Sequence, residues 1–133
     1  MKWFKRIGVA VLSLPVILIL AVIFFEIIGM CVNHAETRRQ THKLQEHLIN
    51  EIPDIAILDV YSETGNTSGT GNHVDCVSIV TFKTTLNTNK VQDIMSEFYN
   101  FDEWYCFVEK NDDGSLYFYL NTPAPFADNI EGH

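Results

Sequence analysis

A glycine-rich polar stretch at residues 62–73 has the residue types of a ligand-binding loop. Loops of this composition wrap phosphate groups in nucleotide-binding proteins. A P-loop needs a lysine at its end, and this stretch contains none. A dinucleotide loop needs a third glycine where Val74 stands. We therefore expect a flexible or ligand-contacting loop and no cofactor site.

His73, Asp75 and Cys76 follow this loop directly and have side chains that bind metals or act in catalysis. Successive strand residues point to opposite faces, so Asp75 and Cys76 cannot share one metal ion. A Cys–His nucleophile pair would have only His73 as its base. The sequence therefore predicts no metal site and no catalytic residue. An enzyme with a cleft at residues 62–73 is kept as an alternative.

The acidic run at residues 109–114 partly resembles a calcium-binding loop. The resemblance fails because Glu109 stands at its first position and Leu120 at its twelfth, where a bidentate glutamate is required. The run instead predicts a type I turn with Gly114 in the left-handed bulge position of a hairpin.

The chain has three cysteines, of which Cys76 and Cys106 lie on predicted strands. These two form a possible disulfide if their strands are neighbours and the compartment is oxidising. Otherwise both are buried free thiols. The sequence alone leaves both alternatives open.

Residues 7–25 form an uncharged apolar run that spans about 28 Å as a helix, close to the roughly 30 Å hydrocarbon core of a bilayer. A cleaved signal peptide would have a shorter core and a small-x-small cleavage site. A lipoprotein box would have a small residue where Met30 precedes Cys31. The run therefore predicts an uncleaved signal-anchor that crosses the membrane once, with Glu26 at the headgroup boundary.

Charge is distributed unevenly along the chain. Lys2, Lys5 and Arg6 precede the apolar run, which predicts a cytoplasmic amino terminus and an extracytoplasmic domain at the cell membrane. Only Glu26 among the seventeen acidic residues lies before position 33, and six of the nine basic residues follow it, so residues 33–133 carry a net charge of −10. This acidic part disfavours nucleic acid and anionic lipid as partners.

The remaining pattern predicts an α+β fold, in which a four-stranded antiparallel sheet of order β-β-α-β-β has an amphipathic helix packed on one face. The first predicted strand is apolar on both faces, which favours an inner or doubly covered strand over an exposed edge. The predicted regions are an anchor at residues 1–32, a solvated stalk helix at 33–53, an acidic domain at 54–121 and a tail at 122–133. The strands are expected at 54–61, 74–85, 104–110 and 115–121, and the helix at 87–100.

A cluster of aromatic side chains is the strongest functional signal. The bulged hairpin places Trp104, Cys106 and Val108 on the face of Leu116, Phe118 and Leu120. It places Tyr105, Phe107, Tyr117 and Tyr119 on the opposite face, a candidate interaction surface. We expect the stalk residues Leu44, Leu48 and Ile52 to cover this aromatic face. If they do not, the face is free for a partner.

Together these features predict a membrane-anchored, non-catalytic binding module that uses its aromatic face for a protein partner or for self-association. An alternative is an accessory subunit of a membrane complex, with Glu26 turned toward another helix.

Overall fold

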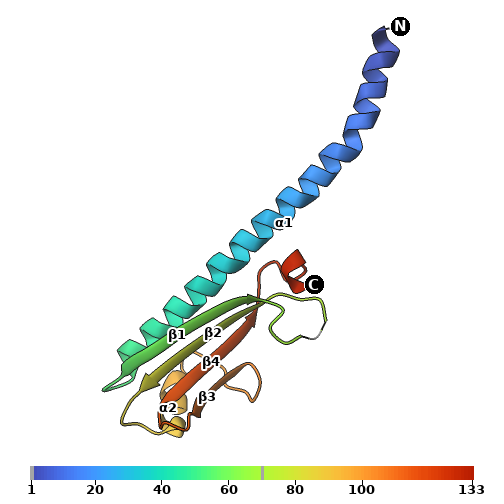
Figure 1. Cartoon of the computed structure of the whole chain (residues 1–133). Helices are drawn as coiled ribbons and strands as arrows, with labels where there is room; N and C mark the ends of the chain where they lie inside the picture. Colours follow the sequence, from blue (N-terminus) through green and yellow to red (C-terminus); the bar gives the residue numbers. More distant parts are fainter. Residues whose placement is uncertain (1, 70) are drawn as a thin grey trace.

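The computed structural model describes the backbone of residues 2–69 and 71–133, and side chains from Ser13 onward. One long helix, α1 (Lys2–Glu51), enters a small α+β domain, as Figure 1 shows. Within the described residues, one helix is long and apolar enough to cross a membrane, and it is α1. Its apolar side chains between positions 14 and 28 are exposed, as expected for a surface in contact with lipid.

α1 runs without a break through the boundary where the sequence predicts a separate stalk. Asn33, the first residue of the predicted stalk, lies within α1 and is fully buried. The helix ends at Glu51, two residues before Pro53, whose ring excludes a continued helix. Because residues between Asn33 and Ile52 pack against the sheet along the helix, the expectation of a solvated stalk is wrong.

The sheet has four strands, β1 (Ala56–Gly65), β2 (Asp75–Lys83), β3 (Cys106–Lys110) and β4 (Leu116–Pro123). They are antiparallel and lie in the order β1-β2-β4-β3, which confirms the α+β class. Two hairpins are joined by the pairing of β2 with β4. The strand β1 was expected to be an inner or doubly covered strand, but it lies at the edge of the sheet, because the second hairpin pairs with β2 alone.

The β3–β4 hairpin has the predicted turn and register. Gly114 has φ 86°, the left-handed conformation that favours glycine. Cys106 pairs with Leu120 and Val108 with Phe118, so these side chains share one face. Trp104 was expected on that face, but β3 begins two residues later, and the indole is 76% exposed.

Two helices cover one face of the sheet, which we call the inner face (Figure 1). The second helix, α2 (Thr88–Met95), begins where the Asn87 side chain accepts a hydrogen bond from the Lys90 N–H at 3.0 Å. One core joins α1 and α2 to β2, β3 and β4. Its residues are Leu44, Leu48, Ile52, Val80, Phe82, Val91, Met95, Cys106, Val108, Leu116, Phe118 and Leu120.

Polar side chains form the other half of the contact between α1 and the sheet. The Thr41 and Ser78 hydroxyl oxygens lie 2.7 Å apart and are buried. Gln40 donates to the Cys76 carbonyl at 2.9 Å and accepts a hydrogen bond from Thr122. These residues continue the helical spacing of the apolar stripe, so one face of α1 stays in contact with the sheet.

The C-terminal tail turns back onto α1 and ends in a short 3-10 helix, η1 (Ile130–Gly132). Asn33 donates to the Phe126 carbonyl at 3.0 Å and accepts from the Phe126 N–H at 2.9 Å. His34 contacts Glu131 at 2.6 Å. The tail therefore packs on the helix near the point where the apolar run ends (Figure 1).

Candidate functional site

A row of apolar and aromatic side chains crosses the sheet face opposite the two helices, which we call the outer face. Tyr61 pairs with Ile79, Ile79 with Tyr119, and Tyr119 with Phe107, so one residue comes from each strand. Directly paired residues point to the same face of a sheet. Tyr61 is 48% exposed and the other three are half-buried.

The aromatic rings on the outer face pack against one another. The Phe107 and Tyr119 rings are stacked, with centroids 4.8 Å apart and an interplanar angle of 17°. The Tyr117 ring meets Phe107 edge-on at 6.1 Å. Tyr105, just before β3, is 58% exposed. The four predicted aromatic residues therefore lie on one face of the sheet and form a largely apolar surface.

The expected cover over this face is absent from the described residues. Leu44, Leu48 and Ile52 belong to the core on the inner face, together with α2. Our expectation that they cover the aromatic face is therefore wrong. Both helices cover the inner face because its β2 and β4 side chains, such as Phe82 and Phe118, are more uniformly apolar than the outer ones.

Carboxylates flank the aromatic row. Asp59 and Glu63 lie on either side of Tyr61 along β1, and Glu109 pairs with Tyr117. The Tyr61 hydroxyl donates to Glu63 at 2.8 Å, and the Tyr117 hydroxyl donates to Glu109. The hydrogen bond to Glu109, with burial and the nearby charge adding to it, raises the pKa of Tyr117 to about 12. The phenols are therefore neutral donors beside an acidic rim.

A hollow of about 330 Å³ lies at the end of the outer face nearest the tail. Its polar lining comes from His73, Asp75, Tyr105 and Asn121. Asp75 is 5% exposed, and its Oδ2 atom accepts a hydrogen bond from the Thr67 hydroxyl at 3.0 Å. Thr67, His73 and Asp75 thus add a polar recess to the aromatic face.

The contacts of His73 do not match those of a catalytic triad. Its Nε2 atom lies 3.1 Å from the Ser68 hydroxyl and 3.3 Å from Asp75 Oδ2. In a triad the nucleophile and the carboxylate contact different ring nitrogens, so that one proton can be taken while the other is held. Here the same nitrogen faces both groups. The described residues contain no cluster of three potential metal ligands.

Cys76 and Cys106 are free thiols in this structure. Their strands, β2 and β3, are separated by β4, so the condition for the possible disulfide is not met. Both side chains are buried on the inner face. Burial raises the pKa of the Cys106 thiol to about 11 and also raises that of Cys76. These properties describe inert core thiols.

The Glu26 carboxylate contacts the tail of its own chain. Its Oε2 atom accepts a hydrogen bond from the Ile130 N–H at 3.0 Å, and the backbone carbonyl of Glu26 accepts one from the Asn129 side chain at 2.9 Å. The contact of Glu26 with another membrane helix stays a prediction. In this structure Glu26 binds the C-terminal tail of its own chain.

Compared with known proteins, the chain matches no family model, no curated protein and no solved structure.

Tyr61 and its acidic neighbours Asp59 and Glu63 belong to this site, although the sequence pattern does not predict them there. The predicted first strand ended at Tyr61, whereas β1 continues to Gly65. A register shift between Ile57 and Asp59 also changes which β1 side chains face outward. The alternation of Asp59, Tyr61 and Glu63 predicts that they share one face of the strand. Which face of the sheet that is depends on the bulge between Ile57 and Asp59.

Proposed function

We propose that this protein is a membrane-anchored, non-catalytic binding module whose outer face binds a cationic polypeptide segment. The uncovered aromatic row with its acidic rim is the observation that carries the proposal. Exposed patches rich in Tyr and Phe are typical of protein interfaces. In this proposal α1 crosses the cell membrane once, the amino terminus is cytoplasmic and the domain is extracytoplasmic.

Charge complementarity supports a basic partner. Asp59, Glu63 and Glu109 are exposed on the outer face, and Lys83 lies at the far end of β2. Residues 33–133 as a whole carry a net charge of −10. Such a field attracts Lys- and Arg-containing segments, and tyrosine rings offer cation–π contacts to them.

The test uses the full chain in nanodiscs and three peptides of equal length, which combine aromatic residues with basic, neutral or acidic ones. We expect the basic peptide to bind most tightly, with weaker binding as salt is raised. Glu63→Gln and Glu109→Gln together should lower its affinity roughly fivefold to thirtyfold, because each charge contributes about 0.5–1 kcal/mol at an exposed interface.

Glu97→Gln is the matched control, because Glu97 is an exposed acid after α2 and lies outside the outer face. It should leave binding of the basic peptide unchanged. Equal binding of the three peptides, or an equal effect of Glu97→Gln, would contradict the cationic partner. Self-association of the unliganded protein, lost in Phe107→Ala, would assign the face to a second copy of this chain instead.

A further inference from the structure

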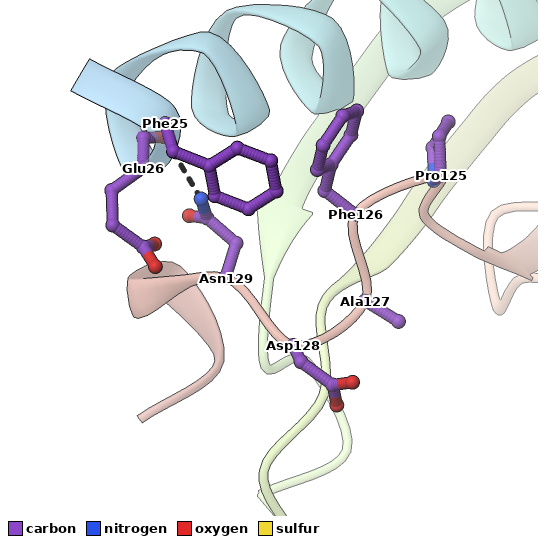
Figure 2. A pocket seen from close by; sticks show the side chains of 7 residues that line it. All are labelled: Phe25, Glu26, Pro125, Phe126, Ala127, Asp128 and Asn129. Atoms are coloured by element: carbon purple, nitrogen blue, oxygen red, sulfur yellow. Dashed lines mark hydrogen bonds between the residues drawn. The ribbon is translucent and has the colours of Figure 1, made fainter. Parts of the chain in front are cut away.

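The contact between α1 and the tail encloses a second hollow, of about 260 Å³. Figure 2 shows its lining, with Phe25 and Glu26 from α1 and residues 125–129 from the tail. The rings of Phe25 and Phe126 have centroids 5.6 Å apart at 66°. The Glu26 carboxylate lies at one edge of the hollow, and Asp128 lines another edge with its side chain pointing away from the two rings.

This hollow is held in shape by buried contacts. Asn33 and Asn129 are 0% and 4% exposed, and they bind the Phe126 backbone and the Glu26 carbonyl respectively. Gly29 permits the close approach, since a Cβ there would lie 2.6 Å from the Asn129 side-chain nitrogen. The tail therefore presents a fixed surface to α1.

The position of the hollow along α1 places it at the end of the apolar run. Glu26 is the first charged residue after nineteen uncharged positions, which span about 28 Å. Phe24 and Ile27 beside it are 66% and 51% exposed. If α1 crosses the bilayer, the hollow lies at the level of the lipid headgroups.

The lining has the chemistry of a site for an organic cation. It combines two phenylalanine rings with two carboxylates, and it contains no Lys, Arg or His. Aromatic rings and carboxylates together recognise ammonium groups, including quaternary ones. The same carboxylates repel the phosphate of an anionic lipid that has no cationic group.

We propose that this hollow binds the ammonium headgroup of a membrane lipid, either ethanolamine or choline. The inference rests on the membrane anchoring proposed above. It does not depend on what the outer face binds. The bound headgroup would hold the tail and the domain at the bilayer surface.

The test measures lipid adducts of the full chain by native mass spectrometry in detergent, with short-chain phosphatidylethanolamine, phosphatidylcholine or phosphatidylglycerol added. We expect roughly twofold to fivefold higher occupancy for the two ammonium lipids than for phosphatidylglycerol. A preference for choline would indicate that the rings dominate recognition. A preference for ethanolamine would indicate hydrogen bonding to the carboxylates.

Asp128→Asn should weaken this preference, because it deletes one of the two carboxylates of the lining. Asp112→Asn is the matched control, since Asp112 is an exposed acid on the distant β3–β4 turn. Equal occupancy of the three lipids, or an equal effect of the two variants, would overturn the headgroup site. Carbonate extraction of reconstituted vesicles tests the anchor separately, because release of the protein would refute anchoring, whereas retention without lipid preference refutes only the site.

Discussion

Asn33 and Phe126 exchange two hydrogen bonds across 93 positions of sequence. The Asn33 amide donates to the Phe126 carbonyl and accepts from its N–H, at 3.0 and 2.9 Å. The Asn33 side-chain amide thus offers both a donor and an acceptor to the Phe126 backbone, as a residue of a neighbouring β-strand does. This pair joins the tail to α1 where the apolar run ends.

Replacing Asn33 with Ala should release the tail from α1. The change leaves the Phe126 N–H and carbonyl without their partners, which costs about 1–3 kcal/mol. Amide hydrogen exchange at Phe126 should therefore accelerate roughly fivefold to 150-fold. Asn50→Ala, at an exposed position of the same helix, is the control and should leave the tail protected. Unchanged exchange in Asn33→Ala would show that other contacts hold the tail.

The buried hydroxyl pair of Thr41 and Ser78 should couple α1 to β2. Thr41→Val or Ser78→Ala alone should each lower the free energy of unfolding by about 1–2 kcal/mol, because each leaves a buried hydroxyl with fewer partners. The double variant should lose less than the sum of the two, with a coupling of at least about 0.5 kcal/mol. Thermal unfolding followed by near-ultraviolet circular dichroism measures all three. Strict additivity would refute the coupling.

Ionisation of Tyr117 should be shifted to high pH by Glu109. The pKa of Tyr117 is raised from 10.0 to about 12, chiefly by that hydrogen bond. Because the folded value exceeds the unfolded one, this contribution to stability is complete below pH 10 and is lost as the pH rises from 10 to about 12. A tyrosinate absorbance titration should show one fewer late-titrating tyrosine in Glu109→Gln.

The control for this titration is Glu103→Gln, which removes an exposed carboxylate near the start of β3. It should leave the Tyr117 transition in place. Tyr99 should titrate late in every variant, because burial raises its pKa to about 12. A Tyr117 transition that is the same with and without Glu109 would contradict the assigned cause.

The three cysteines should differ sharply in reactivity with a maleimide near neutral pH. Cys31 is exposed, whereas Cys76 and Cys106 are buried and have raised thiol pKa values. We expect one fast label on the folded protein in detergent and three after denaturation. Peptide mapping assigns the sites. Rapid labelling of Cys76 or Cys106 in the folded state would show that the inner face opens readily.

The local features of this protein can be predicted from its amino-acid sequence. The uncharged run predicts a helix of membrane length, and the pattern of residues 104–121 predicts a hairpin turning at Gly114 with the observed register. These predictions rest on interactions between residues close in sequence, such as backbone geometry at a glycine and the alternation of strand side chains. The four predicted aromatic residues of the outer face, Tyr105, Phe107, Tyr117 and Tyr119, share one side for the same reason.

The sheet face that the helices cover, and the contacts that hold the tail, depend on long-range packing. The alternation of side chains assigns residues to the two faces of a strand, but it does not determine which face packs against a helix. Toward the amino end of α1, its buried residues change from Leu44 and Leu48 to Thr41 and Asn33. From sequence alone, such polar residues are predicted to be exposed to solvent. Their partners, such as Ser78 and Phe126, lie far away in the chain, so long-range hydrogen bonds make those positions interior.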